Sequence, residues 1–96
     1  MPKLSVDQLT RALEQLPEWK NSSDTIWRIY QFPDFVKAVA FVNRVADIAE
    51  AANHHPDIDI RYNKVTIGLS THDEGGITEK DSDEAGKIEA ASKQSG

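Results

Sequence analysis

The three histidines of this 96-residue chain all lie in one segment, NHHPDIDIRYNKVTIGLSTHD, which begins at Asn53. His54 and His55 are adjacent, and His72 follows near the end of the segment. Imidazole binds metal ions, and it also gives and takes protons near neutral pH. The cluster therefore has three interpretations: a zinc site with three histidine ligands, a general acid–base site, or a helix C-terminus that histidine stabilises.

The residues between the histidines predict a β-hairpin. Apolar and polar residues alternate over 58–62 and again over 65–69, which is typical of strands with one buried face. A two-residue turn at Asn63-Lys64 pairs 62 with 65, 60 with 67 and 58 with 69, so that all six apolar side chains share one face. Extension of this register places His55 opposite His72. We therefore expect the three imidazoles to converge at one end of the hairpin.

A long helix is predicted from Asp34 to Asn53, directly before the paired histidines. Its apolar residues cover about half of the circumference, which is wider than the ~100° stripe of an ordinary surface helix. One interpretation is a helix sunk deep into the core of its own domain. The other is that part of this face packs on another subunit.

The first third of the chain predicts a helix and two strands. Ser5 and Gln8 form a capping-box pattern at the start of the helix, which ends before Pro17. The segment Thr25–Phe32 is rich in β-branched and aromatic residues and predicts a strand. A short strand around Trp19 and Lys20 is expected to pair with it.

A second capping-box pattern, from Thr78 to Asp81, predicts a final helix with Ile88 as its main anchor. This helix is predicted to be weak, because Gly86 interrupts it and its apolar stripe is mostly alanine. The order of elements is α-β-β-α-β-β-α. We expect an α+β fold, a two-layer sandwich with a four-stranded antiparallel sheet and helices on one face, in a single domain over residues 1–96.

Composition excludes several classes of protein. The formal net charge of −5, without a cluster of basic residues, argues against nucleic acid as a partner. No apolar run approaches the ~20 residues of a transmembrane helix, and the N-terminus lacks the apolar core of a signal peptide. We therefore expect no membrane association and a cytoplasmic location. The absence of cysteine excludes disulfides and zinc–thiolate sites.

Several motifs together resemble the pterin-4a-carbinolamine dehydratase family. They are EAANHHP at 50–56, YNKV at 62–65, STH at 70–72, the FPDF segment at 32–35, Trp19 and Asp81. The resemblance runs from about Leu9 to Ile88. It implies the fold expected above and a hydro-lyase reaction, the dehydration of 4a-hydroxytetrahydrobiopterin to quinonoid dihydrobiopterin. That reaction recycles the pterin after aromatic amino-acid hydroxylation, and it requires no metal or other cofactor.

The resemblance also implies roles for individual residues. His54 and His72 would form the catalytic acid–base pair, and His55 would bind and orient the pterin. The implied substrate-binding residues are Glu50, Asn53, Trp19, Thr71 and Asp81. Four of these five residues have a simpler alternative: Trp19 in the core, Asp81 as a helix cap, Glu50 as a solvated helix residue and Thr71 at a strand edge. Asn53 stands where the family frequently has an acidic residue.

Partners follow from the same resemblance. It implies a homodimer through sheet edges, or a homotetramer that also uses the long helices. Some relatives act as a dimerisation cofactor for a homeodomain transcription factor or as assembly factors for carbon-fixing enzymes. The alternative function is therefore a non-catalytic protein-binding module. The complete set of His54, His55 and His72 favours retained catalysis.

Overall fold

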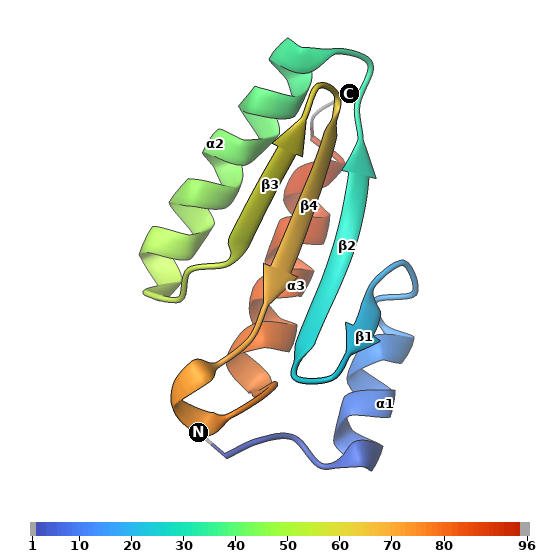
Figure 1. Ribbon diagram of the computed structural model, residues 1–96, viewed down its shortest axis with the longest axis vertical. Helices are drawn as coiled ribbons and strands as arrows, with labels where there is room; N and C mark the ends of the chain where they lie inside the picture. Colours follow the sequence, from blue (N-terminus) through green and yellow to red (C-terminus); the bar gives the residue numbers. More distant parts are fainter. Residues whose placement is uncertain (1, 95–96) are drawn as a thin grey trace.

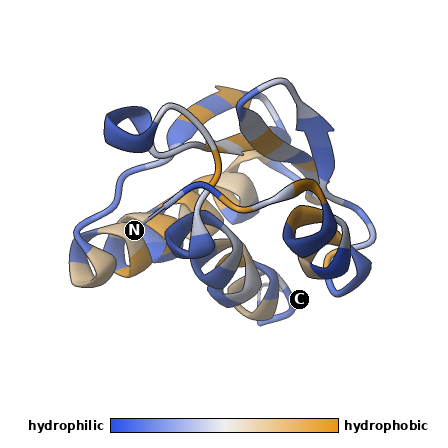
Figure 2. Ribbon diagram, turned by 90° about the horizontal axis from the view of Figure 1, so that it is seen from below, coloured by the Kyte–Doolittle hydropathy of each residue, from blue (hydrophilic) through white to orange (hydrophobic). Residues whose placement is uncertain are grey.

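The computed structural model describes residues 2–94, which form a four-stranded antiparallel sheet with helices packed on one of its faces (Figures 1 and 2). The elements are α1 (Val6–Glu14), β1 (Lys20–Ser22), β2 (Thr25–Gln31), α2 (Phe35–Ala52), β3 (Asp57–Arg61), β4 (Lys64–Leu69), the 3-10 turn η1 (His72–Glu74) and α3 (Glu79–Ser92). The strand order is β1-β2-β4-β3. The predicted α-β-β-α-β-β-α order and the α+β class are confirmed. Within residues 2–94, no helix has the length and apolarity that crossing a membrane requires.

The helix termini form as their sequences predict. At α1, the Ser5 hydroxyl accepts from the backbone N–H of Gln8, and the Gln8 side chain accepts from the backbone N–H of Ser5. At α2, the Asp34 carboxylate accepts from the backbone N–H of Lys37 at 2.8 Å. The other end of α2 is Asn53, in the left-handed conformation with φ 51° and ψ 43°. Asparagine tolerates this conformation better than most residues, so it stops the helix immediately before His54.

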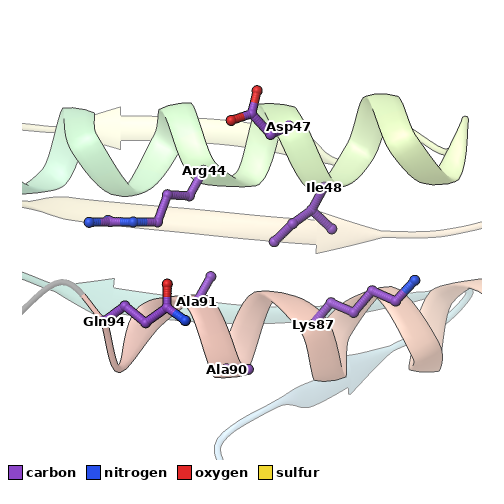
Figure 3. A pocket seen from close by; sticks show the side chains of 7 residues that line it. All are labelled: Arg44, Asp47, Ile48, Lys87, Ala90, Ala91 and Gln94. Atoms are coloured by element: carbon purple, nitrogen blue, oxygen red, sulfur yellow. The ribbon is translucent and has the colours of Figure 1, made fainter.

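The core lies between the sheet and the helices. From β4, Val65, Ile67 and Leu69 point into it, and all three side chains are buried. From α2, Phe41 packs against the ring of Phe32 with 5.0 Å between ring centroids. Ile88 is fully buried, which confirms it as the anchor of α3, and α3 runs beside α2 (Figure 3). Ala90 and Ala91 of α3 line a hollow between the two helices, opposite Arg44, Asp47 and Ile48 of α2 (Figure 3).

The register of the β3–β4 hairpin corrects the prediction by two residues. Ile60 pairs with Val65 and Ile58 with Ile67, and the turn lies at Tyr62-Asn63. The backbone N–H of Phe32 donates to the Asn63 carbonyl, and the Asn63 side chain donates to the Phe32 carbonyl, both at 2.9 Å. These bonds hold Asn63 beside the end of β2 and set the register. Because a shift of two residues preserves alternation, the isoleucines keep their predicted face and only Tyr62 leaves the strand.

The wide apolar face of α2 is only partly covered within the chain. Ala38, Phe41 and Val45 are buried against the sheet. By contrast, Phe35 is 51% exposed and Val36 is 73% exposed. The core of this domain therefore covers one side of the apolar face of α2. Phe35 and Val36, near the N-terminus of the helix, form an apolar strip that remains in contact with solvent.

One carboxylate joins the segment after α1, the sheet and α3. Oε1 of Glu89 accepts from Trp19 Nε1 at 3.0 Å, from the Tyr30 hydroxyl at 2.6 Å and from the Arg28 guanidinium. Burial alone would raise the pKa of Glu89, but the hydrogen bonds from Tyr30, Arg28 and Trp19 lower it. Burial, and then the bond to Glu89, raise the pKa of Tyr30 far above its ordinary value. The carboxylate is thus a charged crosslink inside the domain.

We predict that Glu89→Gln destabilises the fold by about 1–3 kcal/mol at pH 7, because charge-assisted hydrogen bonds from three donors are weakened. The lowered pKa of Glu89 means that its stabilisation is present above the unfolded-state value, near 4.5, and is lost as the pH falls through the folded-state value. Urea denaturation of wild type and variant should therefore show a difference that shrinks toward pH 3. Glu18→Gln, at an exposed carboxylate, is the control. A difference independent of pH would contradict this role of the charge.

Candidate active site

The left-handed turn at Asn53 directs His54 toward α3. The side chain of His54 is only 12% exposed, and its Nε2 lies 2.5 Å from Oδ1 of Asp81. The backbone N–H of His54 donates to the Ala49 carbonyl, which ties the residue to the last turn of α2. A histidine bound at both its backbone and its ring has a fixed orientation, as a residue with a positioned chemical role requires.

Asp81 is completely buried and shares its two oxygens between two tasks. Oδ2 accepts from the backbone N–H of Thr78 at 2.9 Å and from the Thr71 hydroxyl at 2.8 Å. Oδ1 is left for His54. The capping role predicted for Asp81 is therefore present in the structure, and the same carboxylate also contacts His54. If His54 donates its Nε2 proton to this carboxylate, the lone pair of the neutral ring is on Nδ1.

His55 and Glu50 form a second, outer pair. Nε2 of His55 lies 2.5 Å from Oε2 of Glu50, which is about one helical turn earlier in α2. Both side chains are exposed, so their pairing contributes little to stability. Its effect is to hold the His55 ring in one orientation at the rim of the site.

The three histidines line one pocket of about 390 Å³. Its lining residues are Asn53, His54, His55, Ser70, Thr71, His72, Asp73 and Lys80. The convergence survives the corrected register because the chain after β4 bends sharply. Thr71 pairs with Gly76 as an isolated bridge, and η1 begins at His72 between them. The His72 ring is therefore carried on a short turn rather than on a continued strand.

The structure does not bring every predicted residue to this pocket. Glu50 reaches it only through His55, and Asp81 lies behind His54. Trp19 lies elsewhere, because its indole is buried and bound to Glu89 under the sheet. The structure therefore supports the alternative interpretation, in which Trp19 is a core residue and not a pocket residue.

Sequence reasoning missed four residues of the site region. Ser70 belongs to the STH motif but received no site role, Asp73 directly follows that motif, and Lys80 precedes Asp81 on the first turn of α3. The fourth is Glu84, a buried carboxylate with no part in the predicted site. Its position three residues after Asp81 puts it on the same face of α3, which is the signal that could have identified it.

Metal binding receives no geometric support in the described part of the chain. Among residues 2–94, no group of three or more histidine, cysteine, aspartate or glutamate side chains is arranged to hold a metal ion. Nε2 of His54 and Nε2 of His55 each face a carboxylate instead. The pocket combines imidazoles, a lysine and hydroxyl groups, which suits proton transfer to a polar ligand.

Comparison with known proteins shows extensive similarity. The sequence profile described as "Pterin 4 alpha carbinolamine dehydratase" matches residues 2–91. A protein of Acidobacterium capsulatum, provisionally named a pterin-4-alpha-carbinolamine dehydratase, is 53% identical over 90 residues, which cover 94% of this chain and 98% of the relative. A Herpetosiphon aurantiacus protein with the same provisional name is 58% identical over 81 residues, with 84% of each chain covered.

A solved structure agrees with these relatives. The crystal structure of a transcriptional coactivator/pterin dehydratase from Brucella melitensis superposes with a TM-score of 0.90 at 35% identity, and covers 94% of this chain and 98% of its own. The similarity therefore extends over nearly the whole fold.

We predict that Asp81→Asn changes both stability and the state of His54. The amide presents an N–H₂ group or an oxygen, and it cannot serve three donors as the carboxylate does, so we expect a loss of about 1–3 kcal/mol in the free energy of unfolding. NMR correlation of the ring nitrogens at about pH 8.5, where imidazole is mostly neutral, should show a changed tautomer of His54. Glu50→Gln, which alters only the outer pair, should leave both quantities unchanged. An unaltered His54 ring in Asp81→Asn would show that Asp81 does not position it.

Proposed function

Because the chain belongs to the pterin-4-alpha-carbinolamine dehydratase family, we propose that it converts 4a-hydroxytetrahydrobiopterin to quinonoid dihydrobiopterin and water by histidine acid–base catalysis. The observation that carries this proposal is the meeting of His54, His55 and His72 in one pocket, with His54 backed by a buried carboxylate. The reaction would return the pterin to the cycle that serves aromatic amino-acid hydroxylation, in the cytoplasm.

The chemistry requires two proton transfers. The C4a–O bond breaks, and a proton delivered to the leaving hydroxyl makes water. A ring nitrogen loses its proton, and the released electron pair forms the new C=N bond. One group must therefore act as an acid and another as a base, and imidazole can do either near neutral pH.

His54 and His72 have suitable positions for these two roles. They come from different elements, the end of α2 and η1, so they can contact different atoms of one bound ligand. Asp81 holds the His54 ring from behind through Nε2, which leaves Nδ1 to exchange a proton with the pterin. The oriented ring of His54 suits the base, and the exposed ring of His72 suits the acid.

The remaining pocket residues would bind the pterin. Its ring system carries donors and acceptors along one edge, and the pocket offers polar groups from His55, Lys80 and Ser70. A volume of about 390 Å³ is within the range of small-molecule sites. The Glu50 carboxylate would orient His55 for this contact.

We predict that His54→Ala or His72→Ala lowers kcat by about 10²–10⁴-fold with a smaller effect on pterin binding, as for a positioned acid or base. His55→Ala should act mainly on KM, because an orienting contact serves substrate and transition state alike. The double variant His54→Ala/His72→Ala removes the possibility that one histidine substitutes for the other. Wild-type activity in the folded double variant would show that these histidines are not the catalyst.

We further propose that the chain forms a homodimer or homotetramer. The apolar strip at Phe35 and Val36 lines a hollow together with Val39, Ala40 and Asn43 of the same helix. Ile58 and Ile60 are partly exposed on β3, an edge strand of the sheet. Exposed apolar surface and an open strand edge are both features that association covers. The Brucella relative is described as a transcriptional coactivator as well as a pterin dehydratase. The same strip is therefore where a protein-binding role, the alternative function, would act.

Sedimentation at high micromolar concentration should show an oligomer for the wild type and a smaller species for Val36→Asp. Val6→Asp is the matched control, because Val6 is also a highly exposed valine on a helix but lies on α1. A monomeric wild type would refute the proposed assembly. An equal effect of both variants would show that the α2 strip has no special role.

A further inference from the structure

Two threonine hydroxyls behind the main pocket form a series of hydrogen bonds that ends at Asp81. Thr71 Oγ1 donates to Asp81 Oδ2 at 2.8 Å, and it lies 2.9 Å from Thr78 Oγ1. The backbone N–H of Lys80 donates to Thr78 Oγ1 at 3.2 Å. Thr78 and Asp81 are fully buried. We call this series, from the Lys80 N–H through Thr78 and Thr71 to Asp81, the hydroxyl chain.

The chemistry of the groups fixes which atom donates at each link of the hydroxyl chain. A carboxylate only accepts, so the single hydroxyl proton of Thr71 is given to Asp81. Thr71 can then only accept from Thr78, whose own oxygen accepts from the backbone N–H of Lys80. All the donated protons therefore point the same way, from the start of α3 toward the carboxylate. Hydrogen bonds aligned in this way strengthen one another.

The hydroxyl chain determines how Asp81 meets His54. Oδ2 accepts from the Thr71 hydroxyl and from the backbone N–H of Thr78, and these two donors hold the carboxylate in one orientation. Oδ1 then faces Nε2 of His54 at 2.5 Å. A neutral imidazole that donates from Nε2 has its lone pair on Nδ1. The orientation of the carboxylate therefore selects the tautomer of His54.

The same chain fixes the segment that carries His72. The backbone N–H of Thr71 donates to the Gly76 carbonyl at 2.8 Å, and the Thr71 carbonyl accepts from the backbone N–H of Glu74 at 3.0 Å. These bonds close the turn in which η1 begins, directly after Thr71. The Thr71 side chain anchors that turn to the start of α3 through Asp81. Both histidines that the proposed function uses for proton transfer thus depend on one chain.

The start of α1 shows what a helix cap needs by itself. Ser5 begins α1 with the same capping box, and its hydroxyl accepts from the backbone N–H of Gln8. Ser5 is exposed, so water can take its hydroxyl proton. Thr78 is fully buried, and it donates its proton to Thr71. A cap uses only the oxygen, so the donated proton of Thr78 is a contact that helix capping does not require.

We propose that Thr78 is a positioning residue of the dehydration. Its hydroxyl proton, acting through Thr71 and Asp81, keeps the Nδ1 lone pair of His54 toward the pterin and keeps His72 in place. This inference rests on the proposed function. Thr78 is fully buried and is not one of the residues that line the main pocket, so it acts only through its neighbours.

The first test does not depend on enzymatic activity. Thr78→Val replaces the hydroxyl by a methyl group of similar size, which leaves the Thr71 oxygen without its donor. NMR of the ring nitrogens at about pH 8.5 should show His54 protonated on Nε2 in the wild type and a mixture of the two tautomers in the variant. Ser5→Ala removes the matched capping hydroxyl of α1 and should leave the His54 signals unchanged. Identical His54 signals in wild type and Thr78→Val would overturn the proposal.

The second test separates kcat from KM. Thr78→Val should lower kcat about 10–10²-fold with a smaller change in KM, because a reacting group is slightly misplaced while the pocket lining is intact. Thr78→Ser keeps the hydroxyl proton and should restore most of kcat. Ser5→Ala should lower the melting temperature, as Thr78→Val does, because each variant loses a cap, but it should leave kcat unchanged.

Three results would overturn the role of Thr78 while the proposed function stands: an unchanged kcat in Thr78→Val, an equal fall in kcat in Ser5→Ala, or no restoration in Thr78→Ser. No dehydratase activity in the wild type would overturn both. If Thr78→Val does not fold, NMR of the wild type decides. We expect the hydroxyl protons of Thr71 and Thr78 to exchange slowly with water and His54 to be protonated on Nε2. A Thr78 hydroxyl that exchanges as fast as that of Ser5, or His54 protonated on Nδ1, would overturn the proposal.

Discussion

The hydrogen bond between Asp81 and His54 is the interaction on which the rest of the site depends. It joins the start of α3 to the end of α2, and it does so with a carboxylate that also caps α3 and binds Thr71 after β4. Three segments that are distant in the sequence therefore meet at one buried side chain. A change at Asp81 alters the helix start, the path of the chain toward η1 and the orientation of His54 together, because one group serves all three.

Three buried or partly buried acids on α3 show how surroundings decide what a carboxylate does. Glu89 accepts hydrogen bonds from three side chains and serves the fold. Asp81 is also fully bonded, and it serves both the fold and the site. Glu84 lies between these two residues on the same helix, but its carboxylate has no hydrogen-bond partner within residues 2–94. Burial is common to all three, so the difference lies in the hydrogen-bond donors around them.

Much of the fold could be predicted from sequence because local signals determined it. The capping boxes at Ser5 and Thr78, and the stop at Asn53, act through neighbouring residues and appear as expected. The hairpin register was wrong by two because a contact distant in sequence, between Asn63 and Phe32, sets the turn. Alternation alone cannot detect such a shift, since it leaves the buried face unchanged.

Part of the candidate site could likewise be predicted from the sequence, and part of it could not. The meeting of the paired histidines with His72 followed from the hairpin, and it tolerated the error in register because η1 bends back beside the end of α2. Trp19 and Glu84 could not be placed correctly. Each is positioned by packing across the sheet or between helices. The spacing of Glu84 from Asp81 indicates a shared face of α3, but it does not indicate that the Glu84 carboxylate lacks a hydrogen-bond partner among the described residues. Tertiary contacts decide such positions, and a single sequence does not reveal them.

The most direct measurement of the central claim is the rate of dehydration itself. A pterin-dependent hydroxylase generates 4a-hydroxytetrahydropterin in solution, and the appearance of quinonoid dihydropterin is followed by absorbance with and without this protein. We predict a rate that rises in proportion to the protein concentration at catalytic amounts, well above the uncatalysed dehydration, and that persists in the presence of a metal chelator. A rate equal to the uncatalysed one at protein concentrations matching the substrate would contradict the account.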